Sequence, residues 1–159
     1  MAASRRKKTP AEADADEVRS AALRLLARRE YAVAELRGRL ARRGYPGATI
    51  EEVLDALQAD GLLDERRFVE SFVATRAARG DGPLKLRQGL AERGVAEDLI
   101  PEYLDADDPG WLERLEAVRC KRFGPAPPGS YAEWARQARF LQRRGFSAEQ
   151  IRRALRQDF

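Results

Sequence analysis

Hydrophobic residues recur along the chain at helical spacing and also with a longer period. Three segments share one pattern around a glycine, with Leu four residues before it, an apolar residue directly after it, Ile six residues after it and Leu four residues further on. The glycines are Gly44, Gly94 and Gly145, spaced by about fifty residues, a period typical of tandem structural repeats. The pattern therefore predicts three copies of one unit.

Each of these glycines is expected to end a helix. Glycine readily adopts the left-handed backbone conformation that terminates many helices, and the apolar residue after it packs back over the last turn. A second helix then begins a few residues later, so each segment is predicted to be a helix, a turn and a helix. Three polar pairs are expected to cap helix N-termini, namely Thr49 with Glu52, Ser130 with Glu133, and Ser147 with Gln150. The second copy lacks such a pair.

A third helical pattern precedes each helix-turn-helix segment. Its apolar residues share one face in every copy: Val18, Ala22 and Leu25, then Phe68, Val69 and Phe72, then Leu112, Leu115 and Val118. No segment shows the alternating pattern of a strand. We therefore predict an all-α fold of three tandem three-helix, helix-turn-helix-like repeats that form an elongated or curved array. The expected divisions are a disordered basic and acidic tail at 1–15 and repeats at 16–60, 61–106 and 107–159.

The composition excludes several classes of catalytic and metal-binding site. The chain has 159 residues with no histidine and one cysteine, which argues against histidine-based catalysis and favours a reducing compartment. The aspartates at 105, 107 and 108 lack calcium-loop spacing and are expected to form a loop, and the GDGP sequence at 80–83 is expected to be a turn. No apolar run resembles a signal peptide or a membrane span. We expect a cytoplasmic, monomeric binding protein, not an enzyme, without metal or cofactor. Three residues are expected to serve packing: Trp111, Trp134 and Cys120.

The distribution of charge matters more than its sum, because the net charge is only +4. At 100° per residue, Arg136, Arg139 and Arg143 lie opposite Trp134 and Leu141 and form a basic stripe. Arginines at 152, 153 and 156 form a second stripe, whereas 51–65 is acidic without a basic residue. Such stripes are either solvated surface or a contact for an anionic partner. We favour the contact, because neither stripe has interleaved acids to offset the repulsion.

Four short segments also carry a family resemblance. They are LARREY at 26–31 with Glu35 and Leu36 after it, GLLDERRF at 61–68, GPLKL at 82–86, and FLQRRGF at 140–146. In this order and spacing the chain resembles the RecX family of regulators of the bacterial recombinase RecA, over about residues 17–157. One departure is Ala32, where the family usually has a serine or a similar cap, a loss that costs about 1 kcal/mol of stability.

The resemblance implies tandem three-helix units that lie in the groove of the RecA filament on single-stranded DNA and restrain its ATPase, strand-exchange and co-protease activities. It thus implies a modulator of DNA repair and the SOS response that binds RecA filaments, with free DNA as a weaker partner. The alternative is a helix-turn-helix protein that acts on DNA directly, although acidic residues on the third helix of the first two copies oppose it. The candidate residues for binding RecA or DNA are Arg24, Arg28, Arg37, Arg39, Arg66, Arg67, Lys85, Arg87, Arg136, Arg139, Arg143, Arg144, Arg152, Arg153 and Arg156.

Overall fold

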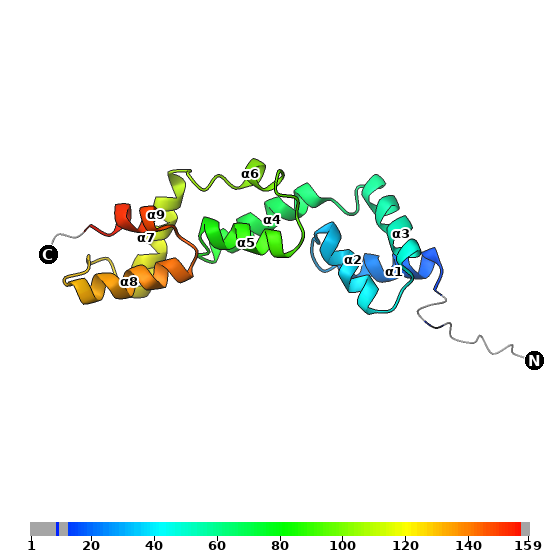
Figure 1. Ribbon diagram of the computed structural model, residues 1–159, viewed down its shortest axis with the longest axis horizontal. Coiled ribbons are helices and arrows are strands. Elements are labelled where there is room, and N and C mark those ends of the chain that lie inside the picture. The colour runs from blue at the N-terminus through cyan, green and yellow to red at the C-terminus, as the bar shows by residue number, and fades with distance from the viewer. Residues whose placement is uncertain (1–8, 10–12, 157–159) are drawn as a thin grey trace, which may run out of the picture. The chain divides into compact units, whose positions relative to one another are not determined.

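The computed structural model describes residue 9 and residues 13–156. Within these residues the chain forms nine helices and no strand, which confirms the all-α fold class (Figure 1). The helices are α1 (Ala15–Leu26), α2 (Val33–Arg42), α3 (Gly47–Ala59), α4 (Glu65–Ala78), α5 (Pro83–Glu92), α6 (Ile100–Tyr103), α7 (Gly110–Phe123), α8 (Tyr131–Arg143) and α9 (Ala148–Ala154). The chain divides into two compact units. Unit 1 contains the described residues up to Phe68 together with Arg93–Val95, and unit 2 contains Val69–Glu92 and the described residues from Ala96 onward.

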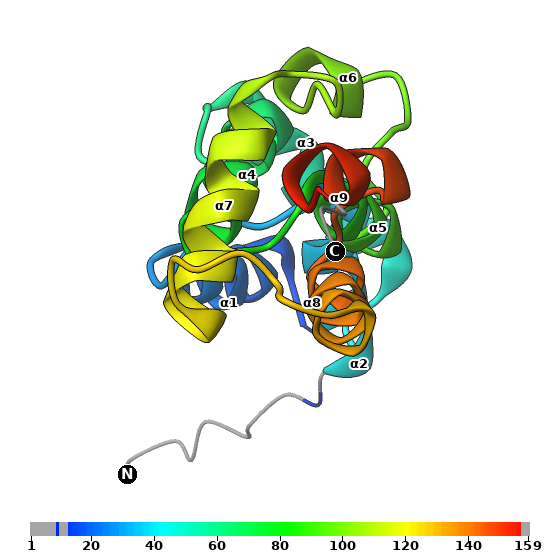
Figure 2. The same ribbon diagram turned by 90° about the vertical axis from the view of Figure 1, so that its left-hand side faces the viewer.

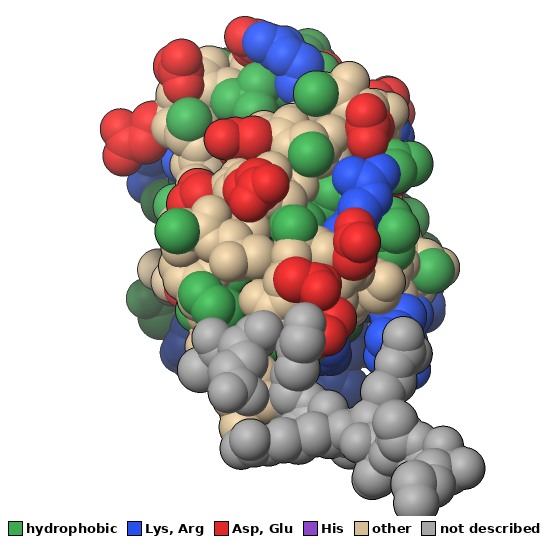
Figure 3. Space-filling view, turned by 90° about the vertical axis from the view of Figure 1, so that its right-hand side faces the viewer, with side chains coloured by type: hydrophobic (Ala, Val, Ile, Leu, Met, Phe, Trp, Pro, Cys, Tyr) green, Lys and Arg blue, Asp and Glu red, His purple; other side chains and the backbone are tan. Residues whose placement is uncertain are grey.

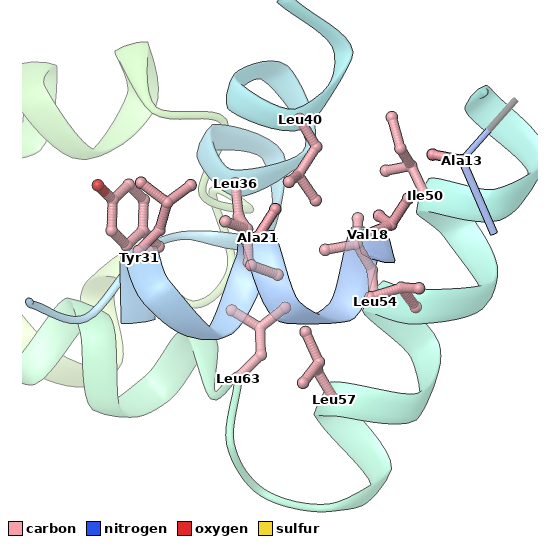
Figure 4. Close-up of a cluster of buried hydrophobic side chains, with 13 residues drawn as sticks. Ala13, Val18, Ala21, Tyr31, Leu36, Leu40, Ile50, Leu54, Leu57 and Leu63 are labelled. Atoms are coloured by element: carbon pink, nitrogen blue, oxygen red, sulfur yellow. The ribbon is translucent and has the colours of Figure 1, made fainter. Parts of the chain in front are cut away.

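The core of unit 1 lies between α1, α2 and α3, each of which packs against the other two. The apolar faces predicted from the helical spacing are buried, and Ala21 joins the face of α1. The buried residues are Val18, Ala21, Ala22 and Leu25 on α1, Leu36 and Leu40 on α2, and Ile50, Val53, Leu54 and Leu57 on α3. Figure 4 shows labelled side chains of the three helices converging, with Tyr31 at one end of the cluster and Leu63 beside Leu57. Full burial of one such aliphatic side chain contributes about 1.5–3 kcal/mol relative to exposure.

The N-terminus of α1 is capped by the residue directly before it, whereas that of α2 is capped by a residue distant in the sequence. Asp14 caps α1, because its carboxylate accepts a 3.0 Å hydrogen bond from the backbone N–H three residues later. Ala13 is buried beside it, so these last residues of the predicted tail belong to unit 1, whereas 1–8 and 10–12 lie outside the described residues. The side chain of Ala32 makes no cap at the start of α2, as predicted. Instead, Glu65 Oε1 accepts a 2.9 Å hydrogen bond from the Val33 N–H and satisfies one of the open donors of that helix.

The three repeat glycines end their helices as predicted. Gly44, Gly94 and Gly145 have φ values of 83°, 75° and 96°, in the left-handed region that glycine adopts without a side-chain clash. The apolar residue after the glycine is buried in the second and third copies, at Val95 and Phe146. The spacing of the glycines therefore reports the positions of three equivalent turns.

The helix caps follow the sequence prediction only in part. Both caps of the third copy are confirmed, since the hydroxyls of Ser130 and Ser147 accept hydrogen bonds from backbone N–H groups three residues later. The predicted capping box at Thr49 is wrong, because α3 begins two residues earlier at Gly47 with Pro46 in the capping position. Proline has a fixed φ close to the helical value, so it starts the helix without a side-chain hydrogen bond. In the second copy, which lacks a capping pair, α6 has only four residues.

Unit 2 is centred on α7, which packs against both α8 and α9 (Figure 2). The buried side chains come from each of its parts: Leu86 and Leu90 on α5, Ile100 and Leu104 at α6, Trp111 and Leu115 on α7, Leu141 on α8, and Phe146, Ile151 and Leu155 around α9. Leu90, Ile100 and Leu104 are repeat positions of the second copy, and Leu141, Phe146, Ile151 and Leu155 are those of the third. Val95 of the second copy is also buried but belongs to unit 1.

A backbone joint connects the α4–α5 turn to the α8–α9 turn in unit 2. The Gly82 N–H donates a 2.6 Å hydrogen bond to the Arg144 carbonyl, and the Leu84 N–H donates a 2.9 Å bond to the Gly145 carbonyl. A Cβ atom on Gly82 would lie 2.5 Å from the carbonyl carbon of Gly145, a separation that real Cβ atoms do not show. The sequence at 80–83 is therefore a turn, as predicted, and its second glycine allows the two turns to touch.

Candidate anion-binding site

The C-terminal end of α4 and the sides of α7 and α8 line a hollow of about 790 Å³ in unit 2. α7 contributes positions at helical spacing, α8 contributes its last turn, and the segment after α4 contributes the residues that lead into the joint. We call this surface the basic hollow. It is lined by Ala77, Ala78, Arg79, Gly80, Arg114, Ala117, Val118, Lys121, Arg122, Phe140, Arg143 and Arg144.

Basic side chains dominate the polar lining of this hollow. Among the residues that the structure describes, six cations line it and no carboxylate does. Within the same part of the chain, only Arg144 among the six has an acidic partner, Asp81, whose Oδ1 lies 3.8 Å from the Arg144 Nη1. Like charges held together without counter-charges repel one another, and a bound anion would relieve that repulsion. The hollow therefore has the electrostatics of an anion site.

Aromatic rings lie among these cations. Phe140 lines the hollow, and Phe123 meets it edge-on with 5.3 Å between ring centroids. The guanidinium carbons of Arg122 and Arg144 lie 5.8 and 5.5 Å from the Phe140 centroid. A second hollow of about 260 Å³ shares Arg122, Phe140 and Arg143 and adds Phe123 and Arg136. We call it the side hollow. Together the basic hollow and the side hollow offer phenylalanine rings and guanidinium groups, which are flat groups on which a planar ligand can stack.

A buried arginine on α7 fixes the loop that follows this helix. Arg119 is only 4% exposed, pairs with Glu116, and donates hydrogen bonds to the backbone carbonyls of 124–126. The hydrogen bond between the two side chains lowers the pKa of Glu116 and raises that of Arg119. Arg119 was not among the residues predicted from the sequence, because only the folded loop shows that its cation is enclosed. Its role is structural.

Three of the predicted binding residues meet at the two hollows. Arg143 and Arg144 line the basic hollow, and Arg136 lines the side hollow. Four further cations of the lining were not predicted as binding residues: Arg79, Arg114, Lys121 and Arg122. On α7 the lining positions 114, 117, 118 and 121 follow the i, i+3, i+4, i+7 spacing of one helical face, so a helical projection would have found that stripe. The position of Arg79 depends on tertiary packing of α4, which no local pattern reports.

The other predicted residues lie outside the hollows, and four of them pair with carboxylates: Arg37 with Glu51, Arg67 with Glu30, Lys85 with Asp81, and Arg153 with Glu149. The expectation that the second stripe has no interleaved acid is therefore wrong, because Glu149 lies one helical turn before Arg153. The remaining candidates are exposed side chains outside both hollows: Arg24, Arg28, Arg39, Arg66, Arg87, Arg139, Arg152 and Arg156.

The acidic segment 51–65 covers part of unit 1 but does not lack cations in space. Figure 3 shows acidic side chains across this end of the unit, where Glu52 and Asp55 of α3 are exposed. Glu51 on the same helix accepts hydrogen bonds from Arg37, and Asp60 lies 2.9 Å from Arg19. The surface is therefore acidic at some positions and neutralised at others.

The segments that carry the family resemblance contact one another in pairs. In unit 1, Glu30 of the first segment accepts a hydrogen bond from Arg67 of the second. Arg29 stacks over the Tyr31 ring at 3.7 Å and pairs with Glu35. In unit 2, the third and fourth segments form the backbone joint. The contacts of these motifs hold the fold together, so the motifs do not by themselves mark a ligand site.

The two tryptophans, the cysteine and the aspartate loop have the structural roles that the sequence predicts. The indole N–H groups of Trp111 and Trp134 donate hydrogen bonds to main-chain carbonyls. The Cys120 thiol donates a hydrogen bond to Glu116 Oε1. Desolvation is the main cause that raises the pKa of this thiol, and the hydrogen bond is the second, so the thiolate is disfavoured. Asp105 accepts a hydrogen bond from the backbone of its own loop. No helix in the described part of the chain is long and apolar enough to cross a membrane.

Family models and related proteins match almost the whole of this architecture. Models of the first, second and third three-helix domains of RecX match residues 19–57, 64–104 and 112–155. A regulatory protein RecX of Halorhodospira halophila is 51% identical over 142 residues, which cover 89% of this chain and 88% of that protein. A regulatory protein RecX of Acidithiobacillus ferrooxidans is 46% identical over 134 residues, which cover 84% and 85% of the two chains.

A solved structure shows the same fold. The crystal structure of RecX from Lactobacillus salivarius aligns with a TM-score of 0.73 at 20% identity, over 89% of this chain and 94% of that one. The three matched family domains follow one another in order, and each contains one of the repeat glycines. Because these domains and the close relatives cover most of its length, the chain belongs to the RecX family of regulatory proteins.

Proposed function

We propose that this protein binds RecA and RecA filaments on single-stranded DNA and inhibits the recombinase, including its ATPase, strand-exchange and co-protease activities. It would thereby modulate DNA repair, recombination and the SOS response in the cytoplasm. The observation that carries the proposal is the match of all three RecX three-helix domains along one chain. Inhibition by binding needs no catalytic group, cofactor or metal.

The surface charge supports a partner made of protein and nucleic acid. Unit 2 carries the basic hollow, whereas α3 of unit 1 exposes Glu52 and Asp55. Acidic side chains repel phosphates, and basic ones attract them. A nucleoprotein filament offers phosphates together with protein surfaces of either sign, so both kinds of surface can contribute to one interface.

The second candidate function, direct action on DNA through a helix-turn-helix, has weaker support. A recognition helix lies in the major groove with side chains directed at base edges. α3 exposes Glu51, Glu52 and Asp55, which would meet phosphates at a cost, and α6 has only four residues. α9 has seven residues, and one of its arginines is already paired with Glu149.

The proposed function is tested with RecA assembled on single-stranded DNA. We expect the full chain to co-sediment with the filament and to slow ATP hydrolysis when added at a stoichiometric ratio. The proposal is wrong if neither the sedimentation nor the hydrolysis rate changes. Binding to duplex DNA together with no effect on RecA would instead support the second candidate.

The contribution of the α8 stripe is tested in the same assay. Replacing Arg136, Arg139 and Arg143 together by Glu should weaken filament binding by at least about tenfold, because two of the three line the hollows and the change reverses three charges. The matched control replaces the same residues by Lys, which keeps the charge. Circular dichroism should report unchanged helix content in both variants. Unchanged affinity of the Glu variant would remove the stripe from the interface.

A further inference from the structure

We propose that the basic hollow and the side hollow together hold a short segment of single-stranded nucleic acid, with phosphates against the cations and one base against Phe140. The inference deepens the proposed function and rests on it for the role of this site within a filament. The binding step itself requires no RecA, so the two proposals can fail separately.

The first support is the concentration of charge. Six cations line the basic hollow, although the net charge of the whole chain is only +4. Another hollow of unit 2, of about 550 Å³ beside α5 and α6, has Arg87 and Glu97 as its only charged lining among the described residues. Unlike this other hollow, the basic hollow therefore gathers cations without acids among the described residues. Neutralising several phosphates at such a place releases counterions and favours binding.

The second support is the arrangement of the two hollows. They share Arg122, Phe140 and Arg143, so the cationic surface continues from one into the other and reaches Arg136. A compact anion would occupy one hollow. A polymer with a phosphate at each residue can occupy both, and grooves that bind single strands combine a cationic path with aromatic side chains in this way.

The third support is the chemistry of the lining. The basic hollow has a volume of about 790 Å³, within the range of roughly 300–1,000 Å³ of small-molecule pockets. The guanidinium carbons of Arg122 and Arg144 lie within 6 Å of the Phe140 ring centroid, so the lining offers guanidinium planes as well as a ring. Unpaired bases stack on phenylalanine rings and on guanidinium planes, whereas the bases of a duplex are stacked on one another. These groups therefore favour a single strand over a duplex, and over an acidic peptide that has no planar group for the ring.

The proposal is tested by fluorescence anisotropy of the full chain with a labelled oligothymidylate of about 16 nucleotides, at the upper end of single-strand site sizes. The test variant carries Lys121→Glu and Arg122→Glu, in the last turn of α7. The control carries Arg42→Glu and Arg43→Glu, which lie at the C-terminal end of α2 in unit 1 and make the same change in net charge. We expect the test variant to lose at least about tenfold in affinity and the control less than about threefold. The slope of log K against log salt should fall by about 1.4 in the test variant, for two lost phosphate contacts.

Other outcomes would overturn the proposal. Equal losses in the two variants would mean that net charge alone attracts DNA. Equal competition by a duplex would contradict the preference for a single strand, and equal competition by an oligoglutamate would assign the hollows to an acidic protein partner. Phe140→Leu removes the ring but no charge, so it should weaken strand binding while leaving the salt slope unchanged. If this variant lost no affinity, the base would not lie against Phe140. Inhibition of RecA that persists without any strand binding would overturn this inference alone.

Discussion

Four arginines of unit 1 and the cations of the basic hollow in unit 2 differ in whether a carboxylate neutralises them. In unit 1, four arginines each have a carboxylate oxygen within 3.0 Å: Arg19, Arg29, Arg37 and Arg67. In the basic hollow of unit 2, five of the six cations have no acidic partner within the described residues. Exposed ion pairs contribute about 0–1 kcal/mol each, so unit 1 gains little stability from these four pairs, but each pair neutralises the charge of one arginine. The basic hollow retains the repulsion between its cations, and with it the capacity to bind an anion.

This difference arises although the repeats share one core pattern. The buried Leu and Ile positions around Gly44, Gly94 and Gly145 are equivalent, and they determine the helices and their packing. Exposed positions are not constrained by the core and differ from copy to copy. Repetition of the fold is therefore compatible with a specialised surface on each copy. Three variants test how far the contrast between the units depends on particular contacts.

The largest effect is expected at the backbone joint beside the basic hollow. Gly145→Ala would direct a methyl group into Lys85 and would force a φ of 96° on an alanine. Backbone strain and overpacking each cost about 1–3 kcal/mol, so we expect a loss of about 4 kcal/mol in the free energy of unfolding. Urea denaturation followed by circular dichroism measures this loss, and strand binding at the hollow should fall with it.

Two glycines provide matched controls for this variant. Gly124 has a φ of 85° with a ψ of 172°, a conformation used almost only by glycine, but no atom of the described residues lies within 4 Å of the position that a methyl group would take, so Gly124→Ala should show the backbone cost alone, about 1–3 kcal/mol. Gly47 lies in the first turn of α3 with open space around it, and Gly47→Ala should be neutral or slightly stabilising. If Gly145→Ala cost no more than Gly124→Ala, the joint would not be the tight contact described above.

The second effect compares a buried ion pair with an exposed one. Arg119→Met removes a cation that is 4% exposed and leaves three carbonyls of the 124–126 loop without their donor. We expect a loss of about 2 kcal/mol, below the full penalty of a buried pair because Glu116 remains half-exposed to water. Arg37→Met in unit 1 breaks an exposed pair and should cost less than about 1 kcal/mol. Thermal unfolding compares the two, and equal losses would contradict the distinction between them.

Local spacing was sufficient to predict most of the fold. The apolar faces and the repeat glycines depend on residues within a few turns of one another, and they gave the helices, the turns and the core. The missing cap at Ala32 was also predictable. Its replacement by Glu65 was not, because that carboxylate comes from 32 positions beyond Val33. Thr49 was misassigned because Pro46 starts α3 by its fixed backbone geometry.

The residues of the candidate site that share one face of one helix were predictable from the sequence. Those that are brought together by the packing of several helices were not. Arg136 and Arg143 belong to the α8 stripe, and both line the hollows. The pairing of Arg153 with Glu149 has i, i+4 spacing and could have been predicted from the sequence. Arg79 joins the basic hollow only because α4, α7 and α8 line the same space. Which arginines stay unpaired is therefore a property of the tertiary structure.

The smallest effect concerns acid stability. The hydrogen bond from Arg119 holds the pKa of Glu116 below its ordinary value of about 4.3. A carboxyl whose pKa is lowered by folding adds stability above its unfolded pKa, and this contribution is lost as the pH falls through the folded pKa. We therefore expect part of the loss of stability below about pH 4.3 to disappear in Glu116→Gln, which cannot ionise. Urea midpoints between about pH 3 and 7 measure this change.

Glu51 in unit 1 is the counterpart for this last test. Its pKa is also lowered, by the hydrogen bond from Arg37, but water surrounds the pair and screens it. Glu51→Gln should therefore flatten the acid limb of the stability curve less than Glu116→Gln does. The order would be reversed if the strength of the hydrogen bond, and not the enclosure of the pair, set its contribution to stability. A reversed order would mean that the exposed ion pairs of unit 1 stabilise the fold more than their exposure implies.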